Sequence, residues 1–374
     1  MRKLVIIHFS PIELYPPVLN WLNFLAAENE PDLEVRVFTM SPAGSSPLFT
    51  SGSGKIKIFR PAPAGGGKVS AYWNYLRFYS ATLFNLIRWR PDTVLYYETL
   101  SAFPALFFKK YIDGQSSLFI HYHEYSSKEE YESGMVLSRW SHRWERKLYP
   151  RAAWISHTNA DRIKLFEKDL EGVSLPTVHA LPNYPPVSWQ SAGRGNHPID
   201  LPVKLVYVGA LSLDTMYTRE LAEWVLRQEG KVTWDIYSDN ITAGAKDYIA
   251  SLTGDRIRFR GSVNYYSLPG KLSGYDIGVI LYKGHISNYV YNAPNKLFEY
   301  LACGLDVWFP DVMKGCRPYI TSGVYPKVSA FDFTDLSQPD LLSTIDRRSL
   351  QYIPSTFYAE QVLPALLQKM KEKK

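Results

Sequence analysis

The sequence of 374 residues has only two cysteines, Cys303 and Cys316, which are too few for a disulfide framework. Such sparse use of cysteine is typical of a protein in a reducing cytoplasm. No apolar run is long enough to span a bilayer, since the nearest, residues 100–108, is short and is interrupted by proline. The apolar run at residues 4–9 is shorter than the core of a signal peptide and lacks a cleavage site of small residues. We therefore expect a cytoplasmic protein that is soluble or lies peripherally at the inner face of the membrane.

Several motifs that carry well-defined chemistry are also missing. The sequence has no G-x-G-x-x-G after a predicted strand, no P-loop and no G-x-S-x-G nucleophile elbow. It has no cysteine and histidine spacing for zinc, and no D-x-D pair to hold a divalent metal against a nucleotide diphosphate. If a diphosphate binds, backbone N–H groups and Lys or Arg must neutralise it. We expect no metal, no cofactor and no nucleic acid as a partner.

What the sequence does contain is a regular alternation of strands and helices. Apolar residues make up 46% of the chain, and its length suits two domains. Apolar runs of the buried-strand type alternate with helical segments in both halves, which predicts an α/β fold with two Rossmann-like parallel-sheet domains facing a cleft. We place the domains at residues 1–185 and 203–354, joined by a linker at 186–202 that is rich in Pro, Gly, Ser and Asn. The segment 41–70 is rich in Gly, Pro and Ser and is predicted to be loop.

One stretch, residues 292–304, reads as a short helix with both ends marked. Pro294 suits its first turn and Gly304 its left-handed end. The apolar run 275–282 ahead of it predicts a buried strand, so the helix N-terminus would lie at the carboxyl edge of a sheet as an anion site. Lys296 would add a charge for a phosphate, and Glu299 an acceptor for sugar hydroxyls. The alternative is an ordinary surface helix with one Lys and one Glu on its wet face.

Two further stretches of the C-terminal half could contact a nucleotide. A predicted strand ends at Gly209, close to Ser212, where a ligand could approach the backbone. The next helix begins near Arg219, which could reach a phosphate or could be an ordinary solvated first-turn residue. A strand and turn through Gly261 and Val263 could hold a base by main-chain contacts, although loop glycines often have no such role.

The N-terminal half has one polar cluster, the sequence His121-Tyr122-His123-Glu124, at the end of a predicted strand. His121 and His123 share one side of that strand, and Glu124 points away. Histidine is suited to position an acceptor hydroxyl near neutral pH. The alternative is a pair of hydrogen-bonded histidines with a structural role in a loop.

Together these stretches resemble the GT-B glycosyltransferases, specifically the family-four-like group that uses nucleotide sugars. The resemblance covers most of the chain and rests on residues 205–212, 260–263, 268–269, 275–282 and 293–304, with 10–20, 121–124 and 181–183 in the first half. It implies that Glu299 binds the nucleotide ribose. It implies that the loop before the helix holds the diphosphate and donor sugar, through Asn292, Pro294, Asn295 and the added Lys296, with Tyr282 nearby.

Two positions depart from the family pattern. Tyr291 stands where the family has a second Glu near the donor sugar, and Asp306 stands where Pro is usual. The first change puts the donor-sugar contacts in doubt and leaves room for an altered activity.

The resemblance implies a metal-independent, retaining hexosyltransferase of polysaccharide biosynthesis. The domain 203–354 would bind a UDP- or GDP-sugar, and the domain 1–185 would bind a glycan or lipid-linked glycan acceptor. The helix 355–374 would pack back on the first domain. Lys296 and Arg219 would stabilise the departing diphosphate, and His123 or His121 would position the acceptor.

Other functions remain open. They are a nucleotide-sugar epimerase of the same fold, a non-catalytic subunit of glycan assembly suggested by Tyr291, and a two-lobed solute-binding protein, which the missing export signal disfavours.

An anionic membrane surface is a further candidate partner. The net charge is +6, and residues 1–195 contain 22 Lys and Arg against 17 Asp and Glu. Aromatic residues make up 15% of the chain, and the segment 68–90 is both basic and rich in them. The alternative for 68–90 is a plain amphipathic helix that packs on the sheet.

Overall fold

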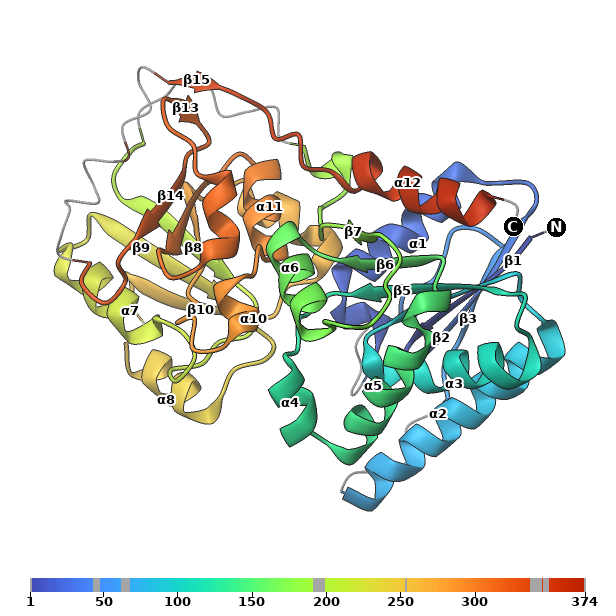
Figure 1. Cartoon of the computed structure of the whole chain (residues 1–374). Helices are drawn as coiled ribbons and strands as arrows, with labels where there is room; N and C mark the ends of the chain where they lie inside the picture. Colours follow the sequence, from blue (N-terminus) through green and yellow to red (C-terminus); the bar gives the residue numbers. More distant parts are fainter. Residues whose placement is uncertain are drawn as a thin grey trace. The chain divides into compact units, whose positions relative to one another are not determined.

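The computed structural model describes residues 2–42, 48–61, 68–190, 199–252, 254–336, 345 and 350–372 (Figure 1). The chain folds into two compact units, an N-terminal unit of Met1–Asn183 with Ala359–Lys374 and a C-terminal unit of Tyr184–Tyr358. The first boundary falls two residues before the predicted 185. Part of the segment predicted as a linker belongs to the C-terminal unit, where Trp189 is buried with its ring 4.8 Å from that of Tyr265. Residues 191–198 of that segment lie outside the described residues.

The N-terminal unit is built on a seven-stranded parallel sheet in the order β3-β2-β1-β4-β5-β6-β7. Its strands are β1 (Arg2–His8), β2 (Leu33–Thr39), β3 (Ile56–Phe59), β4 (Thr93–Tyr97), β5 (Ser117–Tyr122), β6 (Trp154–His157) and β7 (Val178–Ala180). The prediction of loop for 41–70 is therefore wrong at β3. This strand is short, lies at the edge of the sheet and is buried mainly at Ile56, so its flanking Gly, Pro and Ser outweighed it in the sequence.

Helices cover both faces of this sheet. Along β1, Val5 and Ile7 belong to one apolar core, while Leu4 and Ile6 belong to the other. The first core is closed by α2 (Lys68–Trp89), α3 (Ala102–Phe107) with the π-turn η3 (Phe108–Ile112), α5 (Val136–Leu148) and α6 (Ala160–Asp169). The second is closed by α1 (Pro16–Glu28) and α12 (Ala359–Lys371). A short helix, α4 (Lys128–Ser133), carries a complete capping box.

The C-terminal unit repeats this architecture with a six-stranded parallel sheet in the order β10-β9-β8-β11-β12-β14. Its strands are β8 (Val203–Val208), β9 (Val232–Tyr237), β10 (Ile257–Gly261), β11 (Ile277–Val279), β12 (Asp306–Pro310) and β14 (Val328–Phe331), with a separate pair β13 (Val324–Tyr325) and β15 (Gln351–Tyr352). Its helices are α7 (Thr218–Arg227), α8 (Ala243–Leu252), α9 (Leu268–Leu272), α10 (Ser287–Val290) and α11 (Asn295–Ala302).

The strand order locates the ligand sites before any side chain is considered. In the N-terminal sheet the chain winds outward in both directions from β1 and β4, and in the C-terminal sheet from β8 and β11. Open parallel sheets bind their ligands beyond the carboxyl ends of the strands at such a switch point. No helix among the described residues is both long enough and apolar enough to cross a membrane.

Gly278 on β11 permits the close packing of α11 against the sheet. A Cβ at this position would lie 2.1 Å from the ring of Tyr300, a fully buried side chain of α11. The Tyr300 hydroxyl accepts a hydrogen bond of 3.1 Å from the backbone of Val208, so the ring cannot move away without breaking that bond.

Gly278→Ala is therefore expected to lower the free energy of unfolding of the C-terminal unit by about 1–3 kcal/mol or more, because it overpacks a filled core. Urea denaturation followed by circular dichroism would measure this. The matched control is Gly270→Ala on α9, where a Cβ meets no atom within 4 Å. Equal stabilities for the two variants would contradict the packing argument.

Candidate functional site

The C-terminal unit holds a cluster of buried polar side chains around α11. The helix follows β11 through residues 280–294, and Gly304, at φ +75°, lies just beyond its end, as the sequence predicts. Lys296 and Glu299 are only 8% and 7% exposed. An ordinary surface helix would present both charges to water, so the alternative of a solvated face does not hold.

Lys296 lies among aromatic side chains at the carboxyl end of β8. Its Nζ is 3.5 Å from the hydroxyl oxygens of Tyr207 and Tyr282, and it lies 4.8 Å and 5.1 Å from the centroids of their rings. Gly209, at φ +127°, makes room for it, since a Cβ there would lie 3.1 Å from Nζ. Among the described residues no carboxylate lies within ion-pair distance of this ammonium group, so its charge is available to an anion.

The two charges of α11 have shifted pKa values. Burial acts to lower the pKa of Lys296, but the phenol groups of Tyr207, Tyr282 and Tyr300 outweigh burial and hold the pKa above its ordinary value. Burial raises the pKa of Glu299 to about 7, and the charge of Lys296 opposes that rise. In the part of the chain that the structure describes, no side chain or backbone group donates a hydrogen bond to the Glu299 carboxylate. This carboxylate can therefore accept hydrogen bonds from the hydroxyl groups of a ligand.

The loop before α11 is held in place by its backbone. Pro294 is buried and extended, and its carbonyl accepts the N–H of Leu297, which leaves the N–H groups of Asn295 and Lys296 at the open end of the helix. The carbonyl of Asn292 accepts the thiol of Cys316 at 3.3 Å.

Tyr291, at the position of the missing second acid, is packed by its backbone against another loop. A Cβ at Gly315 would lie 2.5 Å from the Tyr291 carbonyl. The Tyr291 ring lies 5.8 Å from the Nζ of Lys314. This position therefore offers a ring where a carboxylate was expected. Asp306, the other departure, accepts the backbone N–H of Lys327 at 2.6 Å and so helps to join β12 to the segment before β14.

Of the other residues predicted to bind the nucleotide sugar, some lie beside Lys296 and others have structural contacts. Tyr282 contacts Lys296, as described above. The Ser212 hydroxyl accepts the N–H groups of the turn that follows it, and Gly261, at φ +73°, ends β10. Val263 is half-buried against the core of this unit. The structure does not bring Arg219 to Lys296, because the guanidinium group lies on the ring of Tyr248 at 4.5 Å.

The N-terminal unit gathers four buried histidines at the carboxyl edge of its sheet. His8 ends β1, His121 lies in β5, His123 follows β5 and His157 ends β6, and none is more than 6% exposed. The rings of His121 and His123 meet edge to face with centroids 4.7 Å apart, so they share a side as the strand alternation predicts. The ring of Tyr97, at the end of β4, stacks on His123 at 5.0 Å.

Four buried ring nitrogens of these histidines have no hydrogen-bond partner: both nitrogens of His157, and one each in His8 and His123. His123 Nδ1 donates to Asn183 Oδ1 at 3.2 Å, and His8 Nδ1 donates to the carbonyl of Ser10 at 2.7 Å. The Nε2 atoms of both rings are buried and have no hydrogen-bond partner. His121 Nδ1 is 2.9 Å from the hydroxyl of Ser156. A bare imidazole nitrogen is an acceptor, which is what an incoming hydroxyl group needs.

The same burial keeps these rings neutral. Burial lowers the pKa of His8 to about 4 and the pKa values of His121 and His157 to about 3 each. Burial and the neighbouring His121 hold the pKa of His123 well below its ordinary value. At neutral pH these side chains are therefore uncharged, and a bare ring nitrogen can accept a hydrogen bond from a hydroxyl group.

Glu98, directly after β4, was not among the predicted site residues. Its backbone has φ +60° and ψ 152°, a conformation that residues other than glycine rarely adopt. Its carboxylate accepts the backbone N–H groups of His123 at 2.6 Å and of Glu124 at 3.3 Å. Burial, with a contribution from the charge of Glu124, raises the pKa of Glu98 to about 8. Glu98 thus fixes the backbone of the histidine loop.

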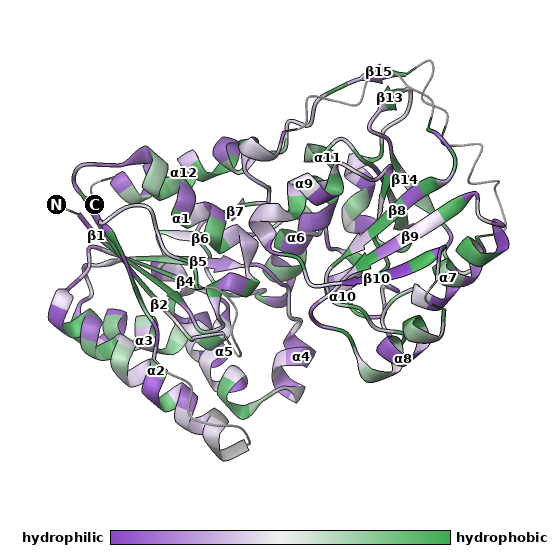
Figure 2. Ribbon diagram, turned by 180° about the vertical axis from the view of Figure 1, so that it is seen from behind, coloured by the Kyte–Doolittle hydropathy of each residue, from purple (hydrophilic) through white to green (hydrophobic). Residues whose placement is uncertain are grey.

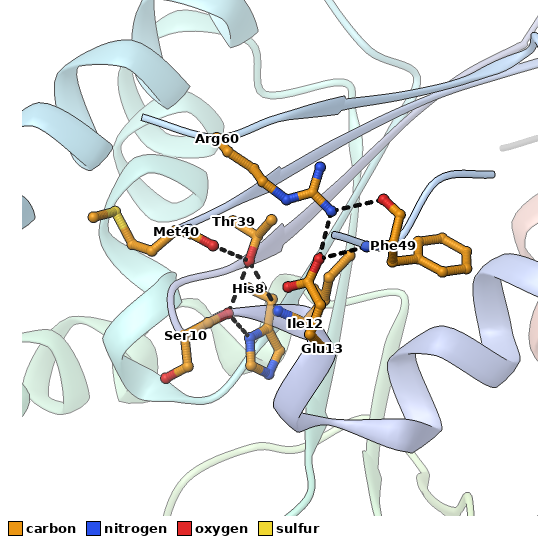
Figure 3. A network of polar contacts seen from close by, with 8 residues as sticks. All are labelled: His8, Ser10, Ile12, Glu13, Thr39, Met40, Phe49 and Arg60. Carbon is orange, nitrogen blue, oxygen red and sulfur yellow. Dashed lines mark hydrogen bonds and ion pairs between the residues drawn. The ribbon is translucent and has the colours of Figure 1, made fainter. Parts of the chain in front are cut away.

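The loop after β1 is held by a second network, shown in Figure 3. The hydroxyl of Thr39 donates to the same Ser10 carbonyl that His8 contacts, at 2.8 Å. Glu13 forms a partly buried ion pair of 2.6 Å with Arg60. The position of His8 is therefore set by β2 and by the segment after β3.

Three of these residues could have been found in the sequence. His8, Glu98 and His157 are polar residues at or just beyond the carboxyl ends of predicted parallel strands, where ligands of such sheets bind. Arg162 had no such signal, although it is buried in α6 and its Nη1 donates to the carbonyl of His123 at 2.6 Å. The described residues contain no group of three or more His, Cys, Asp or Glu side chains arranged to hold a metal ion.

Comparison with known proteins decides the fold. No protein-family model matches the sequence, and no curated protein sequence matches it. Sucrose-phosphate synthase from Thermosynechococcus elongatus has a TM-score of 0.68 over 98% of both chains at 14% identity. HepE from Anabaena, in complex with UDP-glucose, has a TM-score of 0.65 over 99% of both chains at 11% identity. The chain has the GT-B glycosyltransferase fold.

In this GT-B chain the cluster of Lys296 and Glu299 belongs to the C-terminal Rossmann-like domain, and the histidine cluster belongs to the N-terminal one. A Listeria monocytogenes protein described as a candidate UDP-N-acetylglucosamine 2-epimerase is also similar. It has a TM-score of 0.59 at 13% identity, over 100% of this chain and 97% of that one. Membership of family four stays a prediction.

Proposed function

We propose that this chain is a glycosyltransferase that moves a sugar from a UDP- or GDP-sugar to a glycan or lipid-linked glycan. The observation that carries the proposal is the burial of Lys296 and Glu299 at the start of α11, at the switch point of the C-terminal sheet. A buried cation without a carboxylate partner suits a diphosphate, and a buried carboxylate without a donor suits the hydroxyls of a ribose. HepE, a structure with the same fold, is in complex with UDP-glucose.

In this proposal the donor binds to the C-terminal unit. The ammonium group of Lys296 and the free N–H groups at the start of α11 stabilise the charge that develops on the departing diphosphate. Asn292, Pro294 and Asn295 shape the loop that holds it. Arg219 would join them only after leaving the ring of Tyr248. Transfer without a metal and with retention of configuration are parts of the same proposal.

The acceptor binds to the N-terminal unit in this proposal. The bare Nε2 of His123 accepts a hydrogen bond from the acceptor hydroxyl, and His121 holds the ring of His123 from its edge. Because the acceptor is proposed to be a glycan on a lipid carrier, we place the protein in the cytoplasm, peripherally at the membrane.

Replacing Glu299 by Ala is expected to weaken UDP or GDP binding by roughly 10- to 100-fold, because two charge-assisted hydrogen bonds to the ribose are lost. Isothermal titration calorimetry would measure this. The control is Glu223→Ala, an exposed residue of α7, which should bind as the wild type does. Unchanged affinity of the Glu299 variant would remove this residue from the site.

The raised pKa of Glu98 favours epimerisation as a second candidate. A half-buried carboxyl group with a pKa of about 8, beside Glu124, can hold or release a proton near neutral pH. NMR of UDP- and GDP-sugars incubated with the protein alone would separate the candidates. A new epimer without any acceptor supports the epimerase, whereas release of nucleoside diphosphate only with an acceptor supports the transferase. Binding with neither product would indicate a non-catalytic subunit.

A further inference from the structure

The helix α2 is apolar on two faces, and only one of them is buried. Phe78, Tyr79, Leu86 and Trp89 pack into the core. On the other face the exposed fractions are 75% for Tyr72, 55% for Trp73, 54% for Leu76, 62% for Phe84 and 41% for Ile87. Their spacing of three, eight and three residues places Trp73, Leu76, Phe84 and Ile87 in one stripe, because eight residues are close to two full helical turns. Figure 2 shows hydrophobic residues along this helix beside hydrophilic ones.

The apolar surface continues onto the neighbouring helices. At η3, Tyr111 is 55% exposed, and at the start of α5 Val136 is 76% exposed. Aromatic rings join the helices: Tyr79 of α2 lies 5.2 Å from Phe103 of α3, and Phe103 lies 5.5 Å from Trp140 of α5. All three helices pack on the same face of the sheet, so their outer sides form one surface, which we call the α2–η3–α5 surface.

Every outward charge on the α2–η3–α5 surface is positive. The residues Lys68–Trp89 and Ala102–Ile112 include no Asp or Glu. In α5 the only acid, Glu145, is fully buried, and Tyr96 and Tyr122 donate hydrogen bonds to it. Arg77, Arg88, Lys110, Arg143 and Lys147 are all exposed. The Lys110 ammonium group lies over the rings of Tyr111 and Trp144, at 4.8 Å and 5.5 Å.

This combination fits one kind of partner. A single exposed apolar residue needs no explanation, but a stripe of Trp, Leu, Phe and Ile marks an interaction surface. Trp and Tyr prefer the boundary between lipid headgroups and acyl chains, and Arg and Lys at its rim are attracted to anionic headgroups. A second copy of the chain would bring the same positive charges face to face, which disfavours a symmetric dimer.

We propose that the α2–η3–α5 surface docks the protein on an anionic lipid bilayer, with Trp73, Leu76 and Phe84 entering the interface. Docking of this kind requires neither the donor nor sugar transfer, so it stands or falls separately from the proposed function. It also narrows that function, because an acceptor carried by a lipid would be met at the same surface.

Flotation of the full-length protein with vesicles tests the proposal. We expect binding to vesicles of phosphatidylcholine with phosphatidylglycerol, weaker binding at high salt and little binding to phosphatidylcholine alone. The variant with Trp73→Gln, Leu76→Gln and Phe84→Gln should bind on the order of tenfold less or weaker still, since three exposed apolar side chains no longer enter the interface.

The control carries Tyr266→Gln, Ile320→Gln and Ile353→Gln, three similarly exposed residues of the C-terminal unit, and should bind as the wild type does. Circular dichroism confirms that each variant is folded, and unchanged affinity for UDP or GDP in the α2 variant shows that the two proposals are independent.

Three results would overturn the assignment. They are no binding of the wild type to anionic vesicles at low salt, equal binding to neutral and anionic vesicles, and a change of oligomeric state in the α2 variant by light scattering, which would assign the surface to a second copy.

Discussion

Replacing Lys296 by Met is expected to lower the kcat/KM of sugar transfer on the order of 100- to 1,000-fold without lowering the stability of the fold. The loss follows from removing the ammonium group that lies at the end of β8, beside the free N–H groups of α11. Stability is preserved because Met fills a similar volume between Tyr207 and Tyr282 and leaves no buried polar group without a partner in its own side chain.

The pairing of these two readouts makes the test selective. A residue that only supports packing would lose activity and stability together, whereas Lys296 should lose activity alone. Steady-state kinetics and thermal unfolding of the same preparation would measure both. The control is Lys271→Met, at an exposed position on α9, which should keep the activity of the wild type. Full activity of the Lys296 variant would refute its role at the diphosphate.

The N-terminal unit is expected to lose about 3 kcal/mol of stability between roughly pH 7.5 and pH 5.5. Its four buried histidines have folded pKa values lowered by burial, to about 4 for His8 and about 3 for His121 and His157. Below pH 6.5, the pKa of a histidine in the unfolded chain, the unfolded state binds protons that the folded state does not bind. Lowering the pH therefore lowers the stability of the folded state. At roughly pH 5.5 this amounts to about 1.4 kcal/mol for each histidine.

Glu98 opposes this loss. Its folded pKa is raised to about 8, so between that value and its unfolded value of 4.5 the folded state holds the extra proton. Lowering the pH therefore stabilises the folded state through Glu98, by about 2.5 kcal/mol over the same range. The histidines together outweigh it, and the balance is a loss.

Thermal unfolding at the two pH values should show a decrease of about 6–12 °C in the transition of the N-terminal unit. His157→Phe should reduce that decrease, because the ring lies against Tyr122 and Phe166 and neither of its nitrogens has a hydrogen-bond partner. His285→Gln, at an exposed position, serves as the control. A melting temperature that does not change with pH would contradict the burial of neutral histidines.

The sequence predicted the two parallel sheets because their strands are continuously apolar and are buried on both faces. It missed the edge strands β3 and β14, in each of which only one of the four residues is fully buried. The helix that the sequence marked most clearly was α11, because proline and glycine mark its two ends. The sequence could not decide whether Lys296 and Glu299 point to water. Helical spacing shows which residues share one face of a helix, but it does not show whether other parts of the protein pack on that face.

The N-terminal site was predicted only in part. His121 and His123 follow from strand alternation, but their neighbours come from the ends of other strands, and only the sheet order brings them together. Glu98 illustrates the limit, since its role depends on a left-handed backbone that nothing in a Glu residue favours. The roles of all these residues in transfer remain predictions.

The last described helix, α12, has a consequence for how the chain is made. Leu363, Leu366 and Leu367 share a core with Leu19 and Trp21. In the sequence, the whole C-terminal unit lies between these two groups of residues. As synthesis proceeds, the C-terminal unit has all its strands before α12 leaves the ribosome. The N-terminal unit is synthesised first but completes its core last, and until then it exposes the apolar face that α12 later covers.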